Sequence, residues 1–305
     1  MKLCNSSCGR PDMGYQLWAS PITGYRRRGT RLRDFRAALA AKITAYEIFE
    51  PLLSCPSHAP ASDMLMELTR RDFDVAGVRS DPGSPVSGFV KRTNLTSGLV
   101  QEHAEKFPPD EVIDPADTIE QLLDQLRNRR YLFVRLDEAI SGIVTLADLN
   151  KPLVRVYLFG LISLLEIHMS FWVAQEFPND TWKSVIGADR LAKAESTQAQ
   201  RRERGQDLSL SDCLQFADKR DLIVGCDRLR GSLDLRSKKA ATRCLKNAED
   251  LRNTLAHSQY DLVEGSTWSD LIELVLWMRS LIATSDDSVD QHVAEGAHGY
   301  IGALW

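Results

Sequence analysis

The sequence predicts an α+β protein in which a mixed α/β region is followed by an all-α helical bundle. Two observations lead to this prediction. Before residue 151, a unit that contains a helix, a strand, a turn and a second strand occurs twice. After Pro152 the apolar residues instead recur at the three- and four-residue spacing of amphipathic helices.

The composition is that of a globular protein. Of the 305 residues, 43% are hydrophobic and 26% are charged, which is enough apolar material for a sizeable core. The net charge of −4 argues against a chain that binds polyanions over its whole surface. Six scattered cysteines fit a reducing compartment, and Cys4 and Cys8 form the one close pair. Since no second pair at zinc-ligand spacing follows, we expect no metal site.

The N-terminal residues turn polar at once, so no signal peptide is visible. The most apolar stretch, residues 153–173, is interrupted by Arg155, Glu166 and His168. It falls short of the roughly 20 consecutive apolar residues that a membrane span requires. We therefore expect a buried helix, no membrane contact and a cytoplasmic location.

The chain divides into four predicted segments. Residues 1–30 lack periodicity and are expected to form a loosely structured leader. Residues 31–151 form the α/β module, which begins with a helix predicted over 31–49. Residues 152–285 form the helical bundle, and the polar residues 286–305 are expected to form a loose tail.

The repeat in the α/β module is defined by one short pattern. A serine, a glycine, an apolar residue and a valine occur at 87–90 and again at 141–144. The same spacing then leads to Asn94 in the first copy and to Asp148 in the second. A helix-like segment precedes each copy, at residues 63–71 and 118–130, and a short apolar run precedes each turn, at 74–78 and 131–135.

These two copies resemble a tandem pair of CBS domains, a Bateman module, over residues 43–151. The most specific part is the segment 142–148, which fits the family pattern of a glycine, two apolar residues, a threonine, two residues and an aspartate. The resemblance implies an adenine nucleotide as regulatory ligand, with Thr145 on its phosphate and Asp148 on its ribose. A carboxylate can accept both ribose hydroxyls, and the free N–H groups of a helix start suit phosphate.

The first copy departs from this pattern. Lys91 stands at the threonine position and Asn94 at the aspartate position. Lys91 can serve a phosphate as a point charge, and Asn94 can hydrogen-bond to ribose. The alternative is a structural pair of domains that has lost its ligand.

The bundle contains a second motif, which joins Arg252 and Asn253 to Ala256 and His257. This motif, near the end of a helix and ahead of a final amphipathic helix, resembles that of the HEPN superfamily. The resemblance covers residues 153–285. Many members of that superfamily are metal-independent endoribonucleases that act as dimers, while others transfer nucleotides or only bind partners. It implies Arg252, Asn253 and His257 as catalytic residues, RNA as substrate and a homodimer.

The chemistry of RNA cleavage suits these residue types. A histidine can take or give a proton near neutral pH, and an arginine matches phosphate geometry. Asn253 and His257 lie one helical turn apart, so that the amide can orient the imidazole. Arg252 and His257 lie about 140° apart around a regular helix, at about 100° per residue. Either the helix ends between them or a second copy completes the site.

A structural interpretation competes with this one. His257 can be a residue favoured by the helix dipole, with Arg252 paired to Glu249 or Asp250. Glu166 and His168 can be core residues with local partners, although we expect Glu166 to face the motif helix. The basic residues of 236–246 form a solvated face or, beside an active motif, a track for RNA.

The sequence thus predicts a HEPN-type endoribonuclease that needs no cofactor for catalysis and is controlled by an adenine nucleotide. The alternative is a non-catalytic protein that senses nucleotides and dimerises or binds a partner.

Overall fold

A computed structural model describes residues 26, 29–206, 208–235, 237–257, 261–263 and 265–297, without the side chains of 292–297. The chain forms two compact units. The paired-repeat unit contains Leu39–Val156 and Gly265–Ile272, and the helical unit contains Met1–Ala38, Tyr157–Glu264 and Glu273–Trp305. Cys4, Cys8, most of the predicted leader and residues 298–305 lie outside the described residues.

The first repeat contains α4 (Ala61–Arg71), β3 (Val75–Arg79), β4 (Gly88–Lys91) and the 3-10 helix η2 (Arg92–Asn94). β3 pairs in parallel with β2 (Ser54–Pro56) and antiparallel with β4, which gives the sheet order β2-β3-β4. The apolar face of α4 packs onto this sheet, because its buried residues share one core cluster with residues of the strands. The members of that cluster include Ala61, Met64, Leu68, Val78 and Val90.

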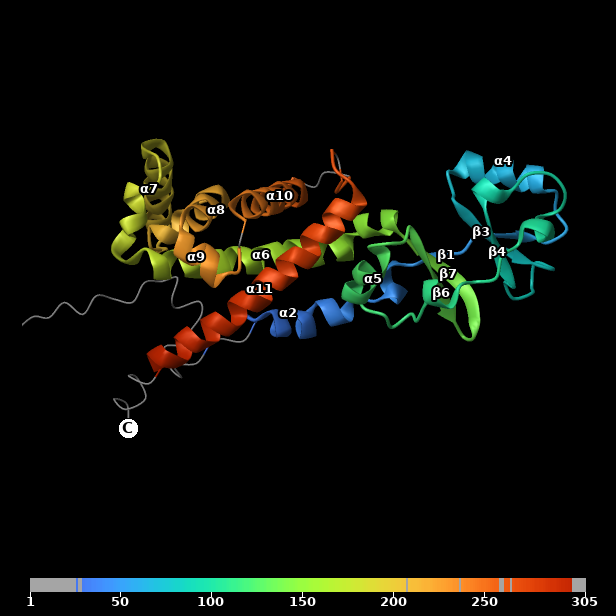
Figure 1. Cartoon of the computed structure of the whole chain (residues 1–305), viewed down its shortest axis with the longest axis horizontal. Coiled ribbons are helices and arrows are strands. Elements are labelled where there is room, and N and C mark those ends of the chain that lie inside the picture. Colours follow the sequence, from blue (N-terminus) through green and yellow to red (C-terminus); the bar gives the residue numbers. More distant parts are fainter. Residues whose placement is uncertain are drawn as a thin grey trace, which may run out of the picture. The chain divides into compact units, whose positions relative to one another are not determined.

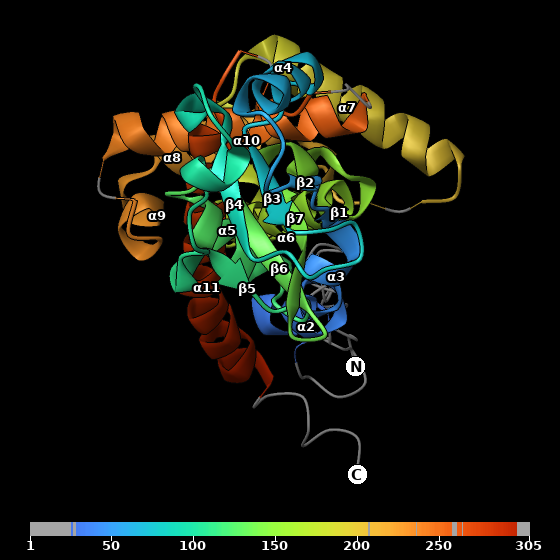
Figure 2. The ribbon, with the colours of Figure 1, turned by 90° about the vertical axis from the view of Figure 1, so that its right-hand side faces the viewer.

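The second repeat has the same order of elements: α5 (Ile119–Leu126), β6 (Tyr131–Leu136), β7 (Ala139–Thr145) and the 3-10 helix η5 (Leu146–Asn150). The sheet order is β1-β7-β6-β5, with β5 (Val112–Ile113) parallel to β6 and β1 (Glu50–Pro51) antiparallel to β7 (Figure 2). Thr118 caps α5 through a capping box with Gln121.

The predicted repeat is therefore confirmed, although α5 ends at Leu126 and is shorter than the helix expected over 118–130. The two sheets share an apolar core that contains an aromatic cluster. In that cluster the Phe133 ring centroid lies 4.8 Å from Phe89 and 4.7 Å from Phe107. The remaining short elements of this unit are η1 (Ala40–Lys42), α3 (Ala45–Ile48), η3 (Val100–His103) and η4 (Pro109–Glu111).

The helical unit is built around α6 (Pro152–Glu176), α10 (Lys238–Ala256) and α11 (Trp268–Ala297) (Figure 1). Its other elements are α2 (Leu32–Ala38), η6 (Pro178–Ser184), α7 (Ala188–Glu203), η7 (Ser211–Cys213), α8 (Phe216–Gly225) and α9 (Asp227–Ser232). α6 is long and apolar enough to span a bilayer by composition. However, 56% of its most apolar window is buried within the protein, as in the core helix of a globular fold.

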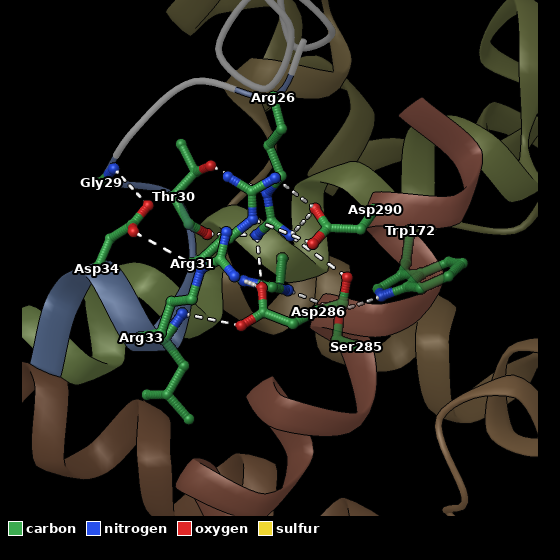
Figure 3. A network of polar contacts seen from close by, with 12 residues as sticks. Arg26, Gly29, Thr30, Arg31, Arg33, Asp34, Trp172, Ser285, Asp286 and Asp290 are labelled. Carbon is green, nitrogen blue, oxygen red and sulfur yellow. Dashed lines mark hydrogen bonds and ion pairs between the residues drawn. The ribbon is translucent and has the colours of Figure 1, made fainter. Parts of the chain in front are cut away.

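Both predictions for the chain ends need correction where the structure describes them. Residues 286–297, expected in a loose tail, continue α11 through Ala297. Arg26, expected in a loose leader, is buried with a side chain that is 1% exposed, and it binds this part of α11 (Figure 3). Its guanidinium lies 2.5 Å from Asp286 Oδ1 and 2.9 Å from Asp290 Oδ1. Backbone N–H of Leu32 donates to Asp286 Oδ2, so the segment ahead of α2 and the last turns of α11 hold one another.

The predicted helix over 31–49 is also wrong in extent, because it breaks into α2, η1 and α3. Thr44 is extended and starts α3 with its own capping box to Glu47. A new helix start inside the segment explains why one continuous helix does not form.

His168 is a core residue, as the structural interpretation holds. It is buried, and its Nδ1 lies 2.6 Å from Ser285 Oγ, which also accepts a hydrogen bond from Trp172 Nε1. Burial, together with the positive charge of Arg26, lowers the pKa of His168 to about 3. The imidazole is therefore neutral at physiological pH.

Candidate functional site

The polar residues of the second repeat lie where β7 ends and η5 begins. Asp148 is buried and forms a capping box with Thr145. Its Oδ2 accepts hydrogen bonds from the Thr145 backbone N–H at 2.7 Å and from the Thr145 hydroxyl at 2.8 Å. The two residues that the sequence assigned to ribose and phosphate therefore touch one another.

Lys151 completes this cluster and was missed by the sequence analysis. Its Nζ lies 3.0 Å from Asp148 Oδ1 and 2.5 Å from Glu50 Oε1, and it donates to the carbonyl of Ile48 at 2.6 Å. Burial alone would lower the pKa of Lys151, but the hydrogen bonds to Glu50 and Asp148 outweigh it and the pKa is raised. The lysine thus stays charged between two carboxylates.

This arrangement leaves limited room for a ligand group on Asp148. A carboxylate offers about four acceptor positions. Thr145 fills two of them and Lys151 fills a third. A ribose that binds through both hydroxyls must therefore displace or share the Lys151 contact.

The first repeat has a different polar cluster at the same place. Lys91 ends β4 and Asn94 ends η2, and both contact the carboxylate of Glu105. The Lys91 Nζ lies 2.9 Å from Glu105 Oε2, and the Asn94 amide donates to Glu105 Oε1 at 2.8 Å. The sequence analysis missed Glu105, which takes the contacts that we assigned to a nucleotide.

Glu50 and Glu105 occupy equivalent positions in the two repeats. Glu50 pairs antiparallel with Ile143, and Glu105 forms an antiparallel bridge with Phe89. Ile143 follows Gly142 just as Phe89 follows Gly88. In each repeat, a segment that crosses the motif strand therefore delivers one carboxylate to a lysine.

The glycines of the motif allow this close crossing. A Cβ on Gly88 would lie 2.6 Å from the carbonyl oxygen of Glu105. A Cβ on Gly142 would lie 2.4 Å from Cδ2 of Phe49, next to Glu50. The repeated glycine thus has a packing role in both copies.

In the helical unit, Arg252 of α10 lies beside an ion pair between Glu166 and the buried Lys219. Its Nε is 3.4 Å from Glu166 Oε2, and Glu166 Oε1 is 3.1 Å from Lys219 Nζ. The expectation that Glu166 faces the motif helix is confirmed. Glu249 and Asp250, the alternative partners of Arg252, instead bind Arg220 and Lys246.

Arg252 and Asn253 line a polar hollow of about 510 Å³ between α7, α8 and α10. Glu166, Arg201, Gln215 and Glu249 also line it. His257 does not belong to this lining. It is exposed at the C-terminal cap of α10, where its backbone N–H still bonds to the carbonyl of Asn253.

α10 ends at Ala256, one residue before His257, and of the two motif residues Arg252 lines the hollow while His257 does not. The basic residues of α10, Lys238, Lys239, Arg243 and Lys246, are exposed. Arg236, the first residue of that predicted basic face, lies outside the described residues.

No family model matches the chain, and no curated protein matches it. Solved structures that are similar to it include CBS-domain proteins, and these similarities cover about 36% of the chain. A CBS domain-containing protein from Bacillus anthracis shares 13% identity with a TM-score of 0.32, covering 36% of this chain and 91% of that one. The ATP complex of the CBS domain of a bacterial CNNM/CorC family Mg²⁺ transporter shares 17% identity with a TM-score of 0.31, covering 36% and 85%.

An uncharacterized conserved protein from Pyrococcus horikoshii shares 15% identity with a TM-score of 0.31, covering 36% of this chain and 90% of that one. These similarities give no support to the HEPN resemblance of the bundle, which stays a prediction.

Proposed function

We propose that the paired-repeat unit senses adenine nucleotides at the second repeat. The observation that carries this proposal is the buried carboxylate of Asp148, held by Thr145 at a strand-to-helix turn. A carboxylate in this position accepts ribose hydroxyls, and the adjacent hydroxyl and backbone N–H groups bind a phosphate oxygen. Lys151 supplies a cation that can turn from Asp148 toward the ligand.

The test is thermal unfolding with AMP, ADP and ATP at millimolar concentration. A ligand of the native state at 100 times its Kd stabilises it by about 2.7 kcal/mol. We expect a rise in the melting temperature of wild type that Asp148→Ala largely loses. Asp81→Ala, at an exposed position in the turn after β3, is the matched control and should keep the rise. If the melting temperature rises equally in both variants, Asp148 does not bind the nucleotide.

We further propose that the helical unit is a HEPN-type endoribonuclease, because one specific observation favours it. Arg252 and Asn253 line a polar hollow in which Glu166 holds the Arg252 guanidinium. In this mechanism His257 either takes the proton of the attacking 2′-hydroxyl or gives a proton to the leaving 5′-oxygen, and Arg252 stabilises the charged phosphorane. No cofactor takes part, and the products carry a 2′,3′-cyclic phosphate.

The proposed site requires a second copy of the chain. Arg252 lies in α10 and His257 caps its C-terminal end, about 140° further around the helix axis at about 100° per residue, and His257 does not line the hollow of Arg252. In a homodimer, His257 of one copy can face Arg252 of the other across the RNA. Such a dimer would act on RNA in the cytoplasm.

The test is cleavage of RNA by the purified protein in EDTA. Arg252→Ala and His257→Ala should each abolish cleavage, while Arg33→Ala, which removes an exposed cation of α2 outside the hollow and the basic face, should retain most of it. Loss of wild-type cleavage in EDTA would indicate a metal enzyme. If wild type does not cut RNA, the chain is instead a non-catalytic nucleotide sensor that dimerises or binds a partner.

We also propose that the nucleotide controls cleavage through the chain connection after Asp148. η5 ends at Asn150 and α6 begins at Pro152, which leaves Lys151 as the single residue between them. Proline fixes its own φ and restricts the residue before it, so this connection has little slack. A Gly-Ser insertion after Lys151 should leave nucleotide binding intact and remove the response of the cleavage rate. A normal response in the insertion variant would exclude this route.

A further inference from the structure

The polar cluster of the first repeat has the chemistry of an anion site. The Lys91 ammonium and the Asn94 amide both direct N–H donors at a single carboxylate, that of Glu105. An ammonium and an amide are also donors that phosphate oxygens accept. The first repeat thus holds a donor pair for a phosphate, and a side chain of the same protein fills it.

The backbone of Glu105 is fixed in this position. Its carbonyl accepts from the Phe89 N–H at 2.9 Å, and its own N–H donates to the Phe89 carbonyl at 2.8 Å. Gly88 permits this approach because any Cβ there would meet the Glu105 carbonyl. The Glu105 carboxylate is therefore positioned by a segment whose backbone is hydrogen-bonded to β4.

The cluster is also accessible from solvent. The side chains of Lys91 and Glu105 are 38% and 36% exposed, and Asn94 is exposed. An anionic ligand can reach the two donors, but it must compete with a carboxylate whose local concentration is set by the fold. In the second repeat, the equivalent Glu50 binds Lys151 instead. Among the described contacts, the Thr145 hydroxyl bonds to Asp148 of its own motif and not to a carboxylate of the crossing strand.

We propose that Glu105 is an internal competitor of nucleotide phosphates at the first repeat. Its carboxylate occupies Lys91 and Asn94, so that the two repeats differ in affinity and the first binds a nucleotide only when Glu105 turns away. This proposal rests on the proposed nucleotide function of the repeats. It assigns the difference between them to one side chain that lies outside the repeated motif.

The test measures ATP and AMP binding by isothermal titration calorimetry in an Asp148→Ala background, which silences the second repeat. Adding Glu105→Gln should tighten ATP binding at least 10-fold, because glutamine keeps the size of the side chain but does not hold Lys91 by charge. Adding Lys91→Ala to this variant should remove the gain. Glu102→Gln removes the same charge at an exposed position of η3. It is the matched control and should give no gain in ATP affinity.

The proposal is overturned if Glu105→Gln binds ATP no more tightly, if Glu102→Gln gives the same gain, or if the gain survives Lys91→Ala. Asp148→Asn replaces Asp148→Ala if the alanine variant does not fold. If the proposed nucleotide function is wrong, the result is different: substitution of Asp148 alone would then cause no loss of nucleotide binding. The effect of Glu105 is compared among variants that share the same residue 148, so the two failures are separate.

Discussion

The two repeats share a backbone and differ in their polar chemistry. Each has a helix, two strands and a 3-10 helix in the same order, and each has a glycine where another segment crosses. In the second repeat a lysine lies between two carboxylates, whereas in the first a carboxylate lies between a lysine and an amide. The two copies therefore keep the order of elements and the crossing glycine, and they differ in the polar residues at the turn.

The largest difference that we expect between the repeats is in stability. Asp148 is buried, and its removal leaves the Thr145 N–H and one Lys151 donor without an acceptor, at a cost of about 2 to 3 kcal/mol in the free energy of unfolding. Asn94 is exposed, so Asn94→Ala should change that free energy by less than about 0.5 kcal/mol. Urea denaturation of Asp148→Ala and Asn94→Ala measures both. Equal losses would show that the two turns carry the same structural role.

A smaller difference is expected between the two motif glycines. In Gly88→Ala the new methyl group meets a backbone carbonyl, which cannot move without breaking the bridge to Phe89. In Gly142→Ala it meets the ring of Phe49, which can rotate. We expect a loss of about 3 kcal/mol for Gly88→Ala and about 1 kcal/mol for Gly142→Ala by chemical denaturation. The reverse order would mean that the second crossing is the more rigid one.

The smallest expected effect is a loss of stability at alkaline pH that arises from Lys151 of the second repeat. Because the pKa of Lys151 is raised above its ordinary value of 10.5, its bonds to the two carboxylates stabilise the protein fully below that pH. This contribution, about 1 kcal/mol or less, is lost as the pH rises through the higher pKa of the folded state. Above pH 10.5, unfolding midpoints of wild type should therefore fall more steeply than those of Lys151→Gln.

The comparison with Lys151→Gln also removes other alkaline effects. Burial raises the pKa of Tyr131 to about 12, and its ionisation destabilises both proteins alike. Parallel pH profiles for the two proteins would mean that Lys151 contributes nothing through its charge.

The sequence predicted the repeat because glycine, valine and the turn residues recur at fixed spacing, and such local patterns determine strands and turns. It also placed Glu166 opposite α10, although this expectation came from the HEPN resemblance, which implies a polar residue at that place. It did not predict the partners of the candidate ligand residues. Glu105 lies 14 residues from Lys91, and the Ile48 carbonyl lies 103 residues from Lys151, so these contacts depend on how strands cross.

The chain ends show the same limit. Arg26 stands in a basic run and residues 286–297 are polar, so each segment by itself is typical of solvated chain. Together they form an ion pair between the buried Arg26 and Asp286, which lie 260 residues apart in the sequence. A charge that is compensated only in the folded protein leaves no periodic signal, and local composition then suggests a loose segment where the structure has an ordered one.

The contact between Arg26 and Asp286 has a consequence for synthesis of the protein on the ribosome. Arg26 emerges 260 residues before the carboxylate that holds it, and every strand of the paired-repeat unit emerges in between. The strands can therefore pair while the helical unit still lacks α11, and the helical unit closes last. A nascent chain or a truncated product that stops short of Asp286 leaves the Arg26 guanidinium without its buried counterion. Loss of the C-terminal turns of α11 thus releases residues at the opposite end of the chain.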